Sequence, residues 1–218
     1  MRYGSMKRFL GAAIGLLLAA GGMVAAQEVN KQKDEEVIRL ANDVRKKILS
    51  LGNYGPFDYL TFGIGPAGKG YTVVLKGYAS RPTLKDDAER AVKRIEAVDA
   101  VDNQIEVLPL SNMDEDIRLR AYAKIYSSPN LSRYNPNRGT PIYGSARSFR
   151  NTVQMGISTN PPMGFHPISI IVKGGNIILE GVVDNEMDKT MAEMMAKQVS
   201  GAFSVTNNLI ALQAAKKK

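Results

Sequence analysis

The chain has 218 residues, of which 29 are basic and 21 acidic, so its formal net charge is +8, and it contains one histidine and no cysteine. The lack of cysteine excludes disulfides, thiol nucleophiles and zinc–thiolate sites. The single histidine, His166, leaves no pair of imidazoles to bind a metal, and no residue spacing resembles an activated nucleophile. We therefore expect no metal site, no cofactor and no catalytic residues.

The first 26 residues have the pattern of a secretory signal peptide. Arg2, Lys7 and Arg8 precede an uncharged run that is rich in leucine, alanine and glycine and ends in small residues at the usual cleavage positions. A permanent membrane anchor is the weaker alternative, because a span normally needs about 20 strongly apolar residues. No cysteine is available for a lipid anchor. We expect a soluble product in the periplasm or outside the cell.

Residues 34–110 predict a unit with the element order αββαβ. Apolar residues at helical spacing follow three acidic residues at 34–36, which the helix dipole favours at a helix start. Alternating apolar residues on both sides of a glycine-rich turn predict a hairpin. A second helix, for which Ser80 is a suitable cap, and a closing strand over 99–107 complete the unit.

The second half of the chain repeats this order at a constant offset of 104 residues without a gap. The matched segments are 73–77 with 177–181, Ala88 with Ala192, and 101–105 with 205–209. A register held over two strands and a helix indicates that each copy packs its own core. The predicted fold class is α+β, with two tandem αββαβ domains at 34–110 and 114–212, each a three-stranded mixed sheet with two helices on one face, followed by a basic tail at 213–218.

The second copy differs by a long insertion near 128–165. About 38 residues separate its first helix from its hairpin, where the first copy uses about nine, and a connection of that length is usually functional or disordered. His166 lies at the end of this insertion, just before a predicted strand, and we interpret it as a loop residue rather than an acid–base catalyst.

The insertion and the helix before it are basic and aromatic. No acidic residue occurs from 117 to 179, where eight basic residues are interleaved with tyrosine and phenylalanine. Residues 27–110 hold 13 basic and 13 acidic side chains, whereas residues 111–218 hold 13 basic and 8 acidic ones. Arginine and tyrosine suit polyanions and half-hydrated interfaces. A binding surface and a solvated loop without carboxylates are both compatible with this composition.

The two copies resemble the BON domain family. The resemblance rests on an apolar strand running into Gly77 and Gly181, on a helix bearing Ala88 and Ala192, and on a closing strand with valine, asparagine and an apolar residue at alternate positions. It covers nearly all of the chain after the signal peptide and departs from the family pattern in the long insertion. The resemblance implies non-enzymatic envelope proteins that associate with phospholipid membranes and help maintain the envelope under stress. It transfers no binding residues, because no shared motif marks them.

From the sequence we therefore expect a periplasmic binding protein, not an enzyme, whose partner is an anionic phospholipid membrane surface. The candidate lipid- and anion-binding residues are Arg118, Arg120 and Lys124 on the helix and Arg133, Arg138, Arg147 and Arg150 on the insertion. The alternative is a structural or partner-binding protein that docks another envelope protein or a cell-wall polymer, and a secreted hydrolase comes third. Nucleic acid is not an expected partner, because the protein is expected to be exported.

Overall fold

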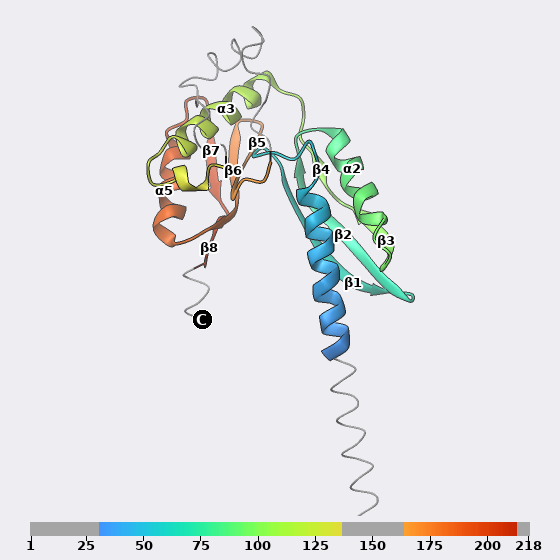
Figure 1. Cartoon of the computed structure of the whole chain (residues 1–218). Coiled ribbons are helices and arrows are strands. Elements are labelled where there is room, and N and C mark those ends of the chain that lie inside the picture. The colour runs from blue at the N-terminus through green and yellow to red at the C-terminus, as the bar shows by residue number, and fades with distance from the viewer. Residues whose placement is uncertain (1–30, 137–163, 213–218) are drawn as a thin grey trace, which may run out of the picture. The chain divides into compact units, whose positions relative to one another are not determined.

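The structure is a computed structural model that describes residues 31–136 and 164–212 (Figure 1). The expected signal peptide and the basic tail lie outside these residues, as do Arg138, Arg147 and Arg150. Within the described ranges, no helix is both long and apolar enough to cross a membrane.

The first repeat has the predicted order of elements. They are a helix over residues 31–49, β1 (Tyr59–Ala67), β2 (Gly70–Ala79), α2 (Pro82–Lys93), β3 (Val98–Asn103) and β4 (Glu106–Val107). Strand β1 pairs antiparallel with β2, and β3 and β4 both pair parallel with β2. The sheet is therefore mixed, and its closing strand is present in two pieces.

The second repeat has the same topology (Figure 1). Its elements are α3 (Asn112–Tyr126), the 3-10 helix η1 (Ser132–Tyr134), β5 (Ile168–Lys173), β6 (Asn176–Val183), α5 (Glu186–Lys197), β7 (Ser204–Asn207) and β8 (Ile210–Ala211). Strand β5 pairs antiparallel with β6, and β7 and β8 pair parallel with β6. The predicted fold class, α+β with two αββαβ domains, is confirmed.

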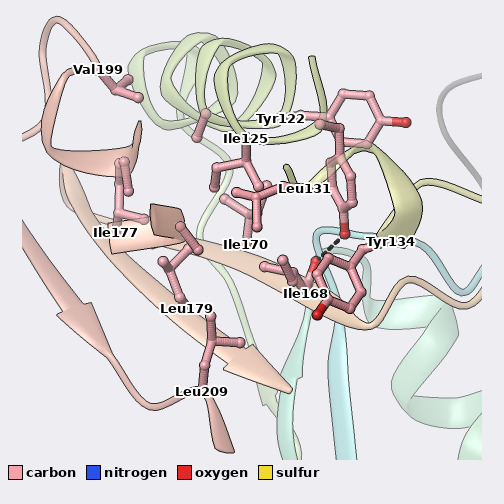
Figure 2. Close-up of a cluster of buried hydrophobic side chains, with 14 of the residues drawn as sticks. Tyr122, Ile125, Leu131, Tyr134, Ile168, Ile170, Ile177, Leu179, Val199 and Leu209 are labelled. Atoms are coloured by element: carbon pink, nitrogen blue, oxygen red, sulfur yellow. Dashed lines mark hydrogen bonds between the residues drawn. The ribbon is translucent and has the colours of Figure 1, made fainter. Parts of the chain in front are cut away.

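The core of the second repeat lies between one face of its sheet and the helices α3 and α5 (Figure 2). Ile125 of α3, Ile170 of β5 and Leu179 of β6 are completely buried. Leu131 and Tyr134, from the first residues of the insertion, belong to the same cluster, and burying a side chain of this size contributes about 1.5–3 kcal/mol. The insertion thus begins as part of the domain core.

The closing strand of each repeat is interrupted at an asparagine. The Asn207 side chain donates to the Lys189 carbonyl at 2.9 Å and to Glu193 at 3.2 Å, and it accepts a hydrogen bond from the Leu209 amide at 3.2 Å. Asn103 makes the same three contacts with the residues 104 positions earlier. The asparagine therefore ties the strand to the preceding helix, which explains why it recurs in both copies.

The predicted cap of α2 is wrong. The N-cap residue is Arg81, which makes no side-chain capping bond, and Pro82 occupies the first helical position. The Ser80 amide instead donates to the buried Asp58 carboxylate at 2.6 Å. In the second repeat Asn185 caps α5 by accepting from the Asp188 amide at 2.9 Å. Ser80 therefore precedes the N-cap position by one residue and does not cap the helix.

The segment before β1 contacts the second repeat. The Ile170 amide donates to the Pro56 carbonyl at 2.7 Å, and the Phe57 ring packs edge-on against Tyr122 with 6.1 Å between centroids. Phe57 is also one of the partly buried residues packed on the core of the second repeat. The division into domains at 34–110 and 114–212 stays a prediction.

Candidate functional site

Helix α3 carries three of the predicted binding residues. It begins after Ser111, whose hydroxyl accepts a hydrogen bond from the Asp114 amide at 3.2 Å. The acidic side chains in its first turn interact favourably with the helix dipole. Ile117, Ala121 and Ile125 recur at four-residue steps and face the core. The helix thus has a fixed orientation, which decides where Arg118, Arg120 and Lys124 point.

Arg118 lies inside the second repeat. Only 5% of it is exposed, and its guanidinium donates to the Val172 carbonyl at 3.1 Å and to the Glu115 carboxylate at 3.1 Å. A buried arginine is costly unless its donors are paired. The two terminal nitrogens of Arg118 are paired and join α3 to β5, whereas its Nε is buried with no hydrogen-bond partner among the described residues. In this structure Arg118 therefore holds the hairpin in place and does not present its charge to solvent.

Arg120 and Lys124 reach over the loop between α5 and β7. The Arg120 guanidinium donates to the Ser200 carbonyl at 3.0 Å, and the Lys124 ammonium donates to the Gln198 side chain at 3.2 Å. Among the described residues, neither cation has an ion-pair partner. Their positive charges are therefore not compensated by neighbouring carboxylates within the described ranges.

Arg133 stands between two carboxylates. Its guanidinium contacts Asp184 at 3.1 Å and also pairs with Asp188. The neighbouring Tyr134 hydroxyl donates to Asp188 at 2.7 Å and accepts from the Asp184 amide at 2.9 Å, while burial raises the pKa of Tyr134 to about 12. This cluster fastens the start of the insertion to the start of α5 and neutralises the charge of Arg133.

A pocket of about 400 Å³ adjoins this cluster. Its walls on the second repeat are Arg133, Tyr134, Phe165, Pro167, Val182 and Asp184. No group of three or more histidine, aspartate or glutamate side chains within the described ranges could hold a metal ion. The pocket combines a paired cation with apolar walls and brings together no nucleophile and base.

His166 is buried beneath two tyrosine rings. Its Nδ1 lies 2.8 Å from the Gly164 carbonyl, and its ring centroid is 5.8 Å from that of Tyr122 and 5.3 Å from that of Tyr126. Its Nε2 is buried with no hydrogen-bond partner among the described residues. Burial lowers the pKa of His166. The loop assignment is correct, but the sequence did not reveal that the ring belongs to the core.

The burial of His166 predicts that acid destabilises the second repeat. Because the folded-state pKa lies below the unfolded value of 6.5, the unfolded state binds more protons at mildly acidic pH. Stability is therefore fully present above pH 6.5 and falls as the pH drops towards the folded-state pKa, by at most about 1.4 kcal/mol per pH unit. Urea unfolding of the wild type between pH 7.5 and 5 should show this slope. The His166→Gln variant should lack it, and an unchanged slope in that variant would assign the dependence to other groups.

Sequence reasoning missed the residues that shape the end of the second repeat near Arg120. The Asp114 carboxylate is 1% exposed and accepts hydrogen bonds from the Gly174 amide at 2.9 Å and the Gly175 amide at 2.7 Å. Phe203, which is 74% exposed, donates its amide to the Gly175 carbonyl at 2.8 Å. The sequence contains one sign that this end differs between the repeats: at the offset of 104 residues, Phe203 aligns with the acidic residue Asp99.

Comparison with solved structures found weak likenesses. One is a structure of CdsD, a structural protein of the type III secretion system of Chlamydia trachomatis, with 13% identity, a TM-score of 0.26, and coverage of 82% of this chain and 96% of that one. Another is the C-terminal domain of CdsD, with 14% identity, a TM-score of 0.25, and coverage of 78% of this chain and 96% of that one. Scores this low carry no argument about function. Comparison with curated proteins found no match.

The family model of the BON domain matches two segments of the chain, residues 69–109 and 153–213. In the first repeat the match begins at the turn before β2 and ends after β4. In the second repeat it includes β5 to β8, whereas α3 and η1 lie outside it. The matched segments contain both glycines and both asparagines that the repeat places at equivalent positions. The chain is therefore a protein with two BON domains in tandem.

Proposed function

We propose that the protein is a non-enzymatic component of the cell envelope that binds anionic phospholipid surfaces through its second repeat and supports envelope integrity under stress. Proteins with BON domains are typically envelope proteins, and the family is known for phospholipid binding. In this proposal residues 1–26 direct export to the periplasm. The protein-docking alternative is an outcome of the tests below.

The observation that carries the proposal is the uncompensated positive charge of the second half of the chain. Residues 27–110 carry equal numbers of acidic and basic side chains, whereas residues 111–218 hold five more basic than acidic ones. Arg120 and Lys124 lack carboxylate partners among the described residues. A well-placed basic residue near an anionic membrane surface contributes about 1 kcal/mol, screened over about 8 Å at physiological salt.

Cosedimentation with vesicles of phosphatidylglycerol and of phosphatidylcholine tests the proposal. One variant replaces five basic residues of the second half by glutamine: Arg120, Lys124, Arg138, Arg147 and Arg150. The matched control replaces five of the first half: Lys69, Lys76, Lys85, Lys93 and Arg94. We expect wild-type binding to anionic vesicles to weaken with salt, the first variant to lose at least tenfold in affinity, and the control to lose much less.

Two outcomes would contradict the proposal. Equal losses in the two variants would show attraction to net charge without a localised surface. Absence of binding to anionic vesicles, or binding that is insensitive to salt and survives both sets of replacements, would favour a protein partner. Arg118 and Arg133 are left unchanged because their guanidinium groups are paired inside the second repeat.

A further inference from the structure

One end of the second repeat is built from two loops that touch. We call it the tip and define it as Gly174 and Gly175 of the β5–β6 turn together with residues 198–203. The Phe203 amide donates to the Gly175 carbonyl at 2.8 Å. A Cβ at Gly175 would lie 2.6 Å from the Phe203 ring, so the ring lies against the backbone of the turn. The glycine is required for this contact.

Phe203 is an exposed side chain on a tip whose backbone is fixed by hydrogen bonds. Its exposed fraction is 74%, and a single exposed apolar side chain needs no explanation by itself. Here, however, the buried Asp114 carboxylate fixes both glycine amides of the turn, and the buried Arg118 fixes the strand that leads into it. Two buried charges thus support a surface turn against which an exposed aromatic ring packs. A preorganised anchor loses little conformational entropy on binding.

Two uncompensated cations contact the tip. Arg120 contacts the tip at Ser200, and Lys124 contacts it at Gln198. Lys197, the residue before the tip, pairs with Glu193 at 2.5 Å and so adds no net charge. The tip therefore presents one exposed apolar side chain, and two positive charges contact it at Ser200 and Gln198. An apolar group combined with positive charges suits the boundary between anionic headgroups and acyl chains.

The first repeat has a different character at the equivalent place. The residues 104 positions before Ser200 and Phe203 are Glu96 and Asp99. The Asp99 carboxylate accepts a hydrogen bond from the Gly70 amide at the start of β2, at 2.8 Å. Arg94 aligns with Gln198, so this end of the first repeat carries two carboxylates and one guanidinium and no aromatic ring at the position of Phe203. The same fold thus carries a polar end of mixed charge in one copy and an end with an exposed aromatic ring and two contacting cations in the other.

We propose that the tip is the part of the second repeat that enters an anionic phospholipid bilayer. The Phe203 ring inserts at the acyl-chain boundary, and Arg120 and Lys124 contact lipid phosphates around it. This inference rests on the proposed function and assigns the part of the second repeat that contacts the membrane.

The chain contains no tryptophan, so one introduced tryptophan reports on its own environment. The Phe203→Trp variant places the reporter in the tip. The matched control is Met187→Trp, because Met187 is also 74% exposed but lies in the first turn of α5, at the other end of that helix. With phosphatidylglycerol vesicles we expect a blue shift and strong quenching by brominated acyl chains for Phe203→Trp and neither for Met187→Trp. The Phe203→Ser variant, checked for folding by circular dichroism, should bind these vesicles at least tenfold more weakly.

The outcomes separate this inference from the proposed function. The wild-type protein could sediment with anionic vesicles while the tryptophan of Phe203→Trp is quenched no more than that of Met187→Trp. This result would overturn the assignment of the tip as the membrane contact and leave phospholipid binding intact. Unchanged affinity of a folded Phe203→Ser variant would overturn it as well. Wild-type protein that does not sediment with anionic vesicles would overturn both proposals.

Discussion

Replacing Gly181 with alanine should destabilise the second repeat by about 3 kcal/mol or more. Gly181 has φ +122°, a conformation that residues with a side chain rarely adopt, and a Cβ there would lie 2.1 Å from the Pro167 carbonyl oxygen. Backbone atoms of a paired strand cannot move aside without breaking the sheet, so strain and clash add. Thermal and urea unfolding followed by circular dichroism measure the loss.

Gly174→Ala is the matched control for Gly181→Ala. Gly174 also has a positive φ, +58°, but no atom lies within 4 Å of the position a Cβ would take. Its replacement should cost about 1–2 kcal/mol from the left-handed conformation alone. The difference between the variants isolates the close approach to Pro167. Equal losses would show that the strand shifts to admit a methyl group and that the contact is unimportant.

Replacing Asp114 with alanine should cost about 2–4 kcal/mol. The carboxylate is 1% exposed and is the acceptor for the amides of Gly174 and Gly175, so its removal leaves the buried Gly175 amide without its acceptor. Urea unfolding measures the loss of stability. Faster hydrogen exchange at these two glycine amides would locate the loss in the turn.

Glu186→Ala controls for the loss of an acidic residue from a first helical turn, because Glu186 is exposed in the first turn of α5. Its removal should cost no more than about 0.5–1 kcal/mol through the helix dipole. A loss as small for Asp114→Ala would mean that the carboxylate serves the helix start and that the turn is held by other contacts.

The repeat in the sequence predicted the fold correctly because equivalent positions in both copies meet the same local requirement. Gly77 and Gly181 both have a positive φ. A Cβ added at either glycine would lie only 2.0 Å or 2.1 Å, respectively, from a backbone carbonyl oxygen. Asn103 and Asn207 bind equivalent partners. Such signals depend on residues close in sequence or on a motif that recurs, and a single chain can display them.

The candidate binding residues were harder to judge because charge alone does not tell which side chains face solvent. Successive positions of a helix turn by about 100°, so Arg118 and Arg120 point in directions about 200° apart. The structure accordingly buries Arg118 and leaves Arg120 over the tip. The helical period could have separated these two arginines before the structure was available.

The sequence by itself determined the elements, their order and the repeated glycine and asparagine positions, because periodicity and backbone conformation are local properties. Only the tertiary structure decided that Arg133 is neutralised by Asp184 and Asp188, which are 51 and 55 residues away. Tertiary structure also formed the tip, where Asp114 meets a turn 60 residues later and Phe203 closes over it. Burial and ion pairing depend on which elements pack together, and that choice is made by the whole core rather than by any segment of the chain.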